Sequence, residues 1–435
     1  MSKEQKQCCK KTSIGGQALL EGIMMRGPKM TAMAVRNPEG EIVIEKFPTE
    51  SVVRGKFFKL PIIRGLFGYI DSMKFGSKCL MRSAEISGLD EAEEEIEREK
   101  REKRLEKAKK NPRKVEKIAK KQAKEDKKRE ELVAKATAKY EAAEVERASM
   151  AEKLESAKQK LADAREGGAD ASSVARLEGE VASLERKTRK AEERANEAKK
   201  TIKNPSMNAL MAIVTSISMI LGVVIAIGLF VLLPTFLYGL AAKYIGFLNP
   251  ENPTARSFVK SVFEGVLKVL ILVGYMGAIS LMKDIRRTFM FHGAEHMTIF
   301  CYEAGLELTV ENVRKQKRFH PRCGTSFLIL MVLVSIFISF FIDPLLSLAG
   351  ITEATVKLYM LIRAGLKILL LPLIVGLGYE LIKVAGRYDN IVTRIISAPG
   401  VWLQHITVFK PTDDMIECAI AAVKEVIPDD GSDNW

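Results

Sequence analysis

The chain has 435 residues, enough for two or three domains, and carries a formal net charge of +14. Its mean hydropathy of +0.02 averages two opposite compositions. Residues 90–205 contain 33 Lys and Arg and 28 Asp and Glu, whereas the remaining 319 residues are about a fifth charged and include long apolar runs. These numbers exclude a single soluble globule.

Residues 1–50 begin with a polar stretch and continue into a glycine-rich segment. Residues 1–11 lack the apolar core of a signal peptide, so no cleaved leader is expected. The glycines of 13–28 do not have the spacing of a phosphate-binding loop. Residues 31–36 and 41–46 are strand-like and flank a four-residue turn, which predicts a β-hairpin in an N-terminal cytoplasmic segment.

Residues 51–88 mix aromatic and aliphatic side chains with Lys and Arg. The apolar stretches are too short and too charged to cross a bilayer, which takes about 20 apolar residues. Such a composition is typical of amphipathic helices that lie in the membrane interface. We therefore expect a pair of interfacial helices here, in contact with membrane lipid.

Residues 89–205 form a charged insert whose apolar residues recur at heptad spacing. The heptads fall into two arms of about 33 residues, each roughly 50 Å long as a helix, on either side of Gly167 and Gly168. The insert therefore predicts a cytoplasmic antiparallel coiled-coil hairpin. Pro112, which follows Asn111, interrupts the helix that leads into it.

The role of this insert stays open between three interpretations. It is a solvated spacer, an arm through which the chain forms a homo-oligomer or binds a protein partner, or an arm that binds nucleic acid such as ribosomal RNA. Dense Lys and Arg between 113 and 124 favour nucleic acid. The interleaved acids and the lack of aromatic stacking residues argue against it.

Four apolar stretches approach or exceed the length needed to cross the hydrocarbon core of a bilayer. They are residues 208–240, 258–282, 326–348 and 356–385. The fold class predicted is therefore mainly α: a polytopic membrane protein with about four transmembrane helices, the N-terminal β-hairpin and the coiled-coil insert.

Several charged residues fall inside these stretches. Lys260, Glu264 and Lys268 recur every four residues and so share one face of the second span. Asp343 interrupts the third span, and Glu380 lies among apolar residues of the fourth. An acid at membrane depth is a functional candidate by default.

The distribution of Lys and Arg predicts the orientation, because cytoplasmic loops carry an excess of both. The segment before the first span and the linker 283–325 are strongly basic, whereas the two opposite loops hold only Lys243 and Arg256. We expect transmembrane helices in 206–282 and 326–385, in the bacterial inner (cytoplasmic) membrane, with both termini cytoplasmic. All six cysteines then face the reducing side, so no disulfide framework is expected.

The C-terminal cytoplasmic segment, residues 386–435, contains two recognisable patterns. Residues 407–409 predict a short strand, and residues 413–426 predict an amphipathic helix.

Three of the four histidines of the chain lie within the 283–325 linker. His292, Glu295 and His296 form an H-x-x-E-H pentapeptide. On a helix, His296 lies about 40° from His292 and Glu295 about 60° to the other side, so both imidazoles can meet one ion beside a carboxylate. This is the spacing of inverted zincins, in which two His bind zinc and the Glu is the catalytic base. His320 and Cys323 are further ligand types nearby.

Two kinds of metal site compete. One is a structural zinc knot of His292, His296, His320 and Cys323, and the other is an open catalytic site of three of these with Glu295 as base. Around either site, the candidate supporting residues are Glu303, Glu380 and Arg322. A structural interpretation, in which the histidines lie on an ordinary polar helix face, stays open.

Three motifs resemble the YqhQ-like family of bacterial membrane proteins: the glycine-rich segment 15–28, the H-x-x-E-H pentapeptide, and residues 320–326. The similarity extends over about 13–88 and 205–428, including Leu403 and Gln404 and residues 411–422. The family is a domain of unknown function whose members some classifications describe as predicted metal-dependent enzymes. The resemblance implies a polytopic membrane protein and a divalent metal, taken here as zinc, but no reaction; the 90–205 insert departs from its compact form.

Three functions follow as hypotheses. The first is a metal-dependent hydrolase acting at the cytoplasmic face on a lipid-linked or protein substrate. The second is a non-catalytic assembly or scaffold factor that uses the basic coiled coil. The third is a transporter using Glu380, Asp343 and the charges of the second span, for which four spans leave little room.

Overall fold

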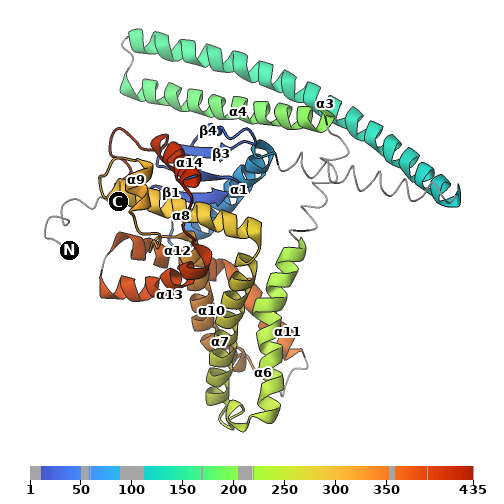
Figure 1. Cartoon of the computed structure of the whole chain (residues 1–435), viewed down its shortest axis with the longest axis vertical. Coiled ribbons are helices and arrows are strands. Elements are labelled where there is room, and N and C mark those ends of the chain that lie inside the picture. Colours follow the sequence, from blue (N-terminus) through green and yellow to red (C-terminus); the bar gives the residue numbers. More distant parts are fainter. Residues whose placement is uncertain are drawn as a thin grey trace. The chain divides into compact units, whose positions relative to one another are not determined.

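The structure is a computed structural model, and the residues that it describes fall into two compact units, which are considered separately (Figure 1). The first unit, from 1–97 and 226–435, holds a small sheet and a helical bundle. The second, from 98–225, holds two long helices. The described residues are 11–49, 58, 60–88, 112–167, 170–203, 218, 220–351, 358–388 and 390–434.

A four-stranded antiparallel meander forms the N-terminal part of the first unit. The predicted hairpin is confirmed as β3 and β4, with Arg36 opposite Ile42. The glycine-rich segment adds a second hairpin, β1 and β2, closed by a two-residue turn between Leu19 and Gly22. The strand bounds are β1 Gly15–Leu19, β2 Gly22–Arg26, β3 Met30–Arg36 and β4 Ile42–Pro48.

Both faces of this sheet are buried, because successive side chains of a strand point to opposite sides. Ile23 and Met25 of β2 pack against helices α8 (Lys283–Glu303) and α14 (Asp413–Lys424). Met24 between them faces helix α1 (Ile63–Ile86), where Cys79 is buried. Figure 1 shows α8 and α14 beside the strands. The sheet is therefore a layer between helices from distant parts of the chain.

The described residues of 51–88 form one long helix, α1, where a pair of helices was expected. Its first half packs against α12 (Leu371–Arg387), and Arg64 donates to Glu380 Oε1 at 2.7 Å. Its second half covers the sheet. Helix α1 thus joins the sheet to the bundle.

Three helices are long and apolar enough to cross a membrane, and a fourth span results if one bent helix pair is counted, all within the described residues. The chain is therefore a candidate membrane protein. The first segment, Ile220–Tyr244, includes η3 (Gly228–Leu232) and α6 (Leu233–Tyr244); residues 208–217 of the predicted span lie outside the described residues. The others belong to α7 (Pro253–Ser280), which follows the short η4 (Gly246–Leu248), and to α10 (Gly324–Leu348).

The fourth predicted span is broken in two. Helices α11 (Tyr359–Leu369) and α12 are bent by 42° at Leu370. Pro372 in the first turn of α12 has no N–H to continue the preceding helix, and its ring disfavours the helical conformation just before it. In the first span, Pro234 likewise has no N–H to donate, and the π-helical turn η3 lies just before it.

An ion network holds α7, α10 and α11 together inside the bundle. Arg363 donates to Glu264 at 2.8 Å and to Asp343 at 2.6 Å; the side chains of Arg363 and Glu264 are buried, and that of Asp343 is partly buried. Lys367 donates to the other oxygen of Glu264 at 2.6 Å. These pairings account for the acids that interrupt the predicted spans, since a buried charge is tolerated when it is paired.

The predicted strand at 407–409 is wrong. Thr407 is the last residue of a helix, α13 (Ile391–Thr407), which the sequence did not suggest because Pro399 lies inside it. Asn390 begins this helix through a capping box with Thr393, and Gly400 packs against Ser326 of α10. Residues 408–412 are extended and lead into α14, close to the predicted helix 413–426.

The second unit consists of α3 (Pro112–Glu166) and α4 (Ala171–Lys203). The two helices are antiparallel, because Arg165 pairs with Glu178 near the turn and Arg194 pairs with Glu146 farther away. Helix α3 is longer than the expected arm and begins at Pro112; residues 89–111 and Gly168 lie outside the described residues. Heptad packing of this hairpin as a coiled coil stays a prediction.

Gly293 of α8 offers a test of the packing between α8 and the chain after α13. A β-carbon at this position would lie 2.0 Å from the carbonyl oxygen of Phe409, a backbone atom with little room to move. We expect Gly293→Ala to lower the free energy of unfolding by about 1–3 kcal/mol or more, as overpacking does. Chemical denaturation of the full chain in detergent measures the change.

The matched control is Gly274→Ala in α7, where nothing lies within 4 Å of the added carbon. This variant should be as stable as wild type or slightly more stable, because Ala favours helices over Gly. Equal stability of the two variants would contradict the packing assigned to Gly293.

Candidate metal centre

The candidate site lies where the sheet-covering helix α8 meets the ends of two bundle helices. Helix α8 supplies His292, Glu295 and His296, all on or near one face. Cys323 directly precedes α10, and Thr407 ends α13. The site is therefore assembled from segments more than 100 residues apart.

Three of the predicted ligands converge. The candidate ligand atoms of His292, His296 and Cys323 lie within 4.8 Å of one another. Among the described residues, these three form the one group of His, Cys, Asp or Glu side chains close enough together to hold a metal ion. His292 Nε2 is 3.0 Å from Cys323 Sγ. The imidazole rings of His292 and His296 are 4.4 Å apart between centroids.

Backbone carbonyl oxygens orient both histidine rings in the same way, by bonding Nδ1 of each. Nδ1 of His292 donates to the carbonyl oxygen of Thr407 at 3.2 Å, and Nδ1 of His296 donates to that of Arg318 at 2.6 Å. A carbonyl can only accept, so each Nδ1 carries a proton and each Nε2 is directed to the cluster as the second nitrogen. This is the arrangement by which proteins orient metal-binding histidines.

The second nitrogen of His296 is unsatisfied. His296 is 1% exposed, and its Nε2 has no hydrogen-bond partner among the described residues. Leaving a buried polar atom without a partner costs about 1–3 kcal/mol. A metal ion bonded to Nε2 would remove this cost, so the residues present fit a metal ion.

Electrostatics favour a thiolate at Cys323. Burial penalises that charge, but His292 and His296 outweigh the penalty and hold the pKa of the Cys323 thiol well below its usual value. Burial likewise opposes a charged His292, yet the adjacent thiolate raises the pKa of His292 to about 9. The amide N–H of Thr325, in the first turn of α10, also points at Cys323 Sγ at 3.4 Å.

Glu295 lies beside this group and is 6% exposed. Its Oε1 accepts a hydrogen bond from the amide of Gly16 in β1 at 3.1 Å. Burial raises the pKa of Glu295, and the nearby His292 and His296 offset only part of this increase. Glu295 is thus a buried carboxyl group whose proton is held more tightly than usual.

His320 lies outside the three-ligand group. Its ring packs against Phe300 and His296, and its Nδ1 accepts from the amide of Arg322. Burial lowers the pKa of His320, which favours the neutral ring. Its backbone is held by Gln404, which accepts from the N–H and donates to the carbonyl of His320.

The three predicted supporting residues separate into two places. Glu303 pairs with Arg322 and accepts a hydrogen bond from the amide of Thr12 at 2.9 Å. Glu303 and Arg322 therefore lie outside the cluster and bind the N-terminal segment. Burial opposes the charge of Glu303, but His320 and Arg322 outweigh it and lower the pKa. Glu380 instead pairs with Arg64 at the α1–α12 contact.

The groups that sequence analysis missed are mostly backbone atoms. The carbonyls of Thr407 and Arg318 and the amide of Gly16 carry no side-chain signature, so no pattern could reveal them. Gly16 has a steric requirement as well, because a β-carbon there would lie 2.9 Å from the carboxyl carbon of Glu295.

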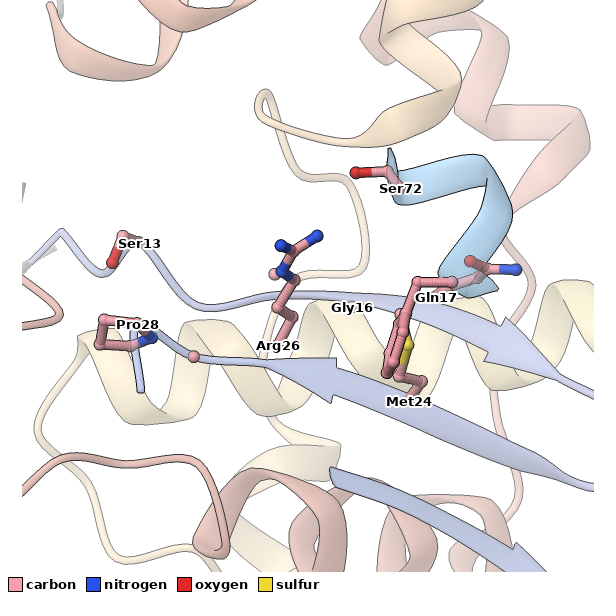
Figure 2. Close-up of a pocket in the computed structure, with 10 residues that line it drawn as sticks. Ser13, Gly16, Gln17, Met24, Arg26, Pro28 and Ser72 are labelled. Atoms are coloured by element: carbon pink, nitrogen blue, oxygen red, sulfur yellow. The ribbon is translucent and has the colours of Figure 1, made fainter. Parts of the chain in front are cut away.

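A cavity of about 430 Å³ lies on the other side of Gly16 (Figure 2). Its lining comes from β1, β2, the turn after β2, and α1. Because the amide of Gly16 bonds Glu295, the cavity reaches a residue in contact with that carboxyl group.

The fold and the site together define a helical protein with three or four candidate membrane spans and a buried His–His–Cys cluster. Residues 175–429 match the family model described as "Protein of unknown function (DUF1385)". Because the match covers more than half of the chain, the protein belongs to this family. The YqhQ-like resemblance is thereby confirmed.

The chain is similar to the uncharacterized protein YqhQ of Bacillus subtilis (strain 168). The two are 33% identical over 201 residues, which cover 46% of this chain and 56% of the relative. The match thus spans little more than half of the relative's length. No solved structure matches the chain.

Metal content tests the cluster. We expect the purified protein to carry about one divalent ion, and Cys323→Ser or His296→Ala to lose it, because either change removes one of three ligand atoms. Elemental analysis by mass spectrometry after gel filtration measures the content.

His405→Ala is the matched control, because His405 is exposed and does not belong to the cluster: its Nδ1 bonds the carbonyl of Trp402, and its ring packs against Phe319. This variant should keep the ion. A wild-type protein without stoichiometric metal would contradict the prediction.

Proposed function

We propose that this protein is an integral protein of the bacterial cytoplasmic membrane with a cytoplasm-facing zinc site that supports hydrolysis. The observation that carries the proposal is the convergence of His292, His296 and Cys323 within 4.8 Å, with one orphaned imidazole nitrogen. Three protein ligands leave a fourth position open, which is typical of catalytic rather than structural zinc.

The donor set favours zinc. A thiolate and two imidazoles suit zinc better than they suit magnesium, calcium or manganese, which prefer oxygen ligands. When bound, a divalent ion would supply Lewis acidity towards a carbonyl or phosphoryl oxygen.

Glu295 is the proposed proton carrier. Its carboxyl group is buried beside His292 and His296, and the Gly16 amide positions one of its oxygens. A raised pKa brings a carboxyl group closer to neutrality, where general acid–base catalysis is most effective. Glu295 would therefore accept a proton from the attacking group and return it to the leaving group.

The proposed orientation rests on charge. The basic linker that contains the site and the basic N-terminal part would face the cytoplasm, together with both termini. The exposed side chains of the amphipathic helix α13 include Ile391, Ile395 and Trp402, which suits contact with lipid at the membrane boundary. This location favours a lipid-linked or membrane-bound protein substrate.

A second candidate function is a scaffold or assembly factor. It is favoured by the charged α3–α4 hairpin, whose side chains are mostly exposed and lie outside the unit that carries the site. Such an arm would bind a protein partner, a second copy of the chain, or the ribosome.

Glu295→Gln separates the two functions. In a hydrolase, this change should lower turnover about 10²–10⁴-fold, because the amide cannot exchange the proton, while metal content stays unchanged. Turnover is measured on p-nitrophenyl acetate, p-nitrophenyl phosphate and fluorescent casein.

Glu307→Gln, at an exposed position in the loop after α8, is the matched control and should keep wild-type turnover. Undiminished turnover in Glu295→Gln would remove Glu295 from the mechanism. A zinc-loaded wild type that cleaves none of these probes would favour the scaffold.

Deletion of residues 90–205 tests the scaffold. If the arm binds a partner, proteins that co-purify with the full chain from membranes should disappear with the deletion, while metal content persists. Quantitative mass spectrometry of the co-purified proteins gives the result. An unchanged set of partners would count against the scaffold.

A further inference from the structure

The cavity beside Gly16 contains one cationic side chain, Arg26. This arginine projects from β2 on the same side as Met24, towards α1 (Figure 2). The side chain of Arg26 is partly buried and, within the part of the chain that the structure describes, forms no ion pair or hydrogen bond. Other arginines of this unit, such as Arg36, Arg64 and Arg82, are each paired with a carboxylate. An unpaired guanidinium in a cavity is suited to bind an anion.

The rest of the lining mixes polar and apolar residues. Ser13 and Ser72 bring hydroxyl groups to the cavity, and Gly15 and Gly27 leave its backbone uncovered. Met24, Pro28 and Phe75 provide apolar contacts. Arg26 is the only charged residue among the lining residues. The cavity therefore complements a group with one oxyanion and an adjoining carbon skeleton.

The position of the cavity connects it to the candidate metal centre. Gly16 lines the cavity, and its amide bonds Glu295 behind it. The other wall belongs to α1, whose first half packs on α12 of the bundle. A ligand in this cavity thus lies between the proposed proton carrier and a helix that contacts the candidate spans.

We propose that this cavity binds the phosphate group of an organic phosphate, with Arg26 as its anchoring cation. The guanidinium fork matches phosphate oxygens in pairs, and the two hydroxyl groups add donors. The phosphate comes from a lipid headgroup or from a soluble ester of the same chemistry. This inference rests on the proposed function in one respect: it names the substrate class of the Glu295 site.

Calorimetric titration of the full chain in dodecyl maltoside tests the proposal, with sn-glycerol 3-phosphate as the probe. The protein carries Glu295→Gln, so that no turnover disturbs the measurement. We expect saturable binding of the probe and none of glycerol, which lacks the phosphate. Arg26→Met should weaken binding about 10- to 100-fold, which is the contribution of hydrogen bonds to a charged group.

Lys74→Met is the matched control, because Lys74 is an exposed cation on α1 that does not line the cavity. It should bind the probe as the parent protein does. Added phosphatidylglycerol identifies the source: competition with the probe indicates a lipid headgroup, and no competition indicates a soluble ester. Either result supports a phosphate site.

Two results would overturn the proposal: no binding of the probe or of phosphatidylglycerol, or equal binding by Arg26→Met. These failures are distinct from failure of the proposed function. Binding without any hydrolysis by the wild type would refute the hydrolase alone, whereas Glu295-dependent hydrolysis without probe binding would refute the phosphate site alone.

Discussion

Burial of the second half of helix α8, from Phe291 to Glu303, is the constraint on which the rest of the first unit depends. Ten residues between Phe291 and Glu303 are buried, and the cluster residue His296 is one of them. One side packs on the sheet and α14, and another lies so close to the chain after α13 that Gly293 has no space for a side chain. Because interiors are close-packed, such a helix cannot rotate or slide without opening cavities.

This fixed position determines the chemistry of the site. When α8 is held in place, the rings of His292 and His296 are oriented by the carbonyls of Thr407 and Arg318, so that Nδ1 of each ring is bonded and Nε2 of each is directed to the cluster. The electrostatic coupling of the thiolate with His292 follows from the 3.0 Å distance between them. Rigid packing around polar groups is what gives a metal or catalytic site its geometry.

The candidate spans obey a related rule, by which charge inside apolar helices is paired. Arg363 binds Glu264 and Asp343, which joins α7, α10 and α11 through one guanidinium group. Between α1 and the bundle, the Arg64–Glu380 pair joins α1 to α12 and so positions the wall of the cavity. Arg26, the one cation among the lining residues of that cavity, has instead no carboxylate partner among the described residues, which is why we propose it as a binding group.

The sequence by itself determined the features that depend on local pattern. Apolar runs predicted the second and third candidate spans within a few residues, the alternation around the 37–40 turn predicted the β3–β4 hairpin, and the H-x-x-E-H spacing placed His292 and His296 on one helix face. The heptads and the high charge of the insert predicted two long helices there, distinct from the apolar segments of the chain. Each of these signals lies within one contiguous segment, where helix or strand periodicity can be read directly.

The tertiary structure determines how these segments combine. It selected Cys323 and not His320 as the third member of the cluster, placed Glu380 on Arg64, and turned residues 391–407 into a helix despite Pro399. It also brought Gly16 to Glu295 across 279 positions of sequence. The reason is physical: backbone carbonyls and amides are alike at every residue, so their choice of partners depends on packing between distant segments and leaves no pattern in the sequence.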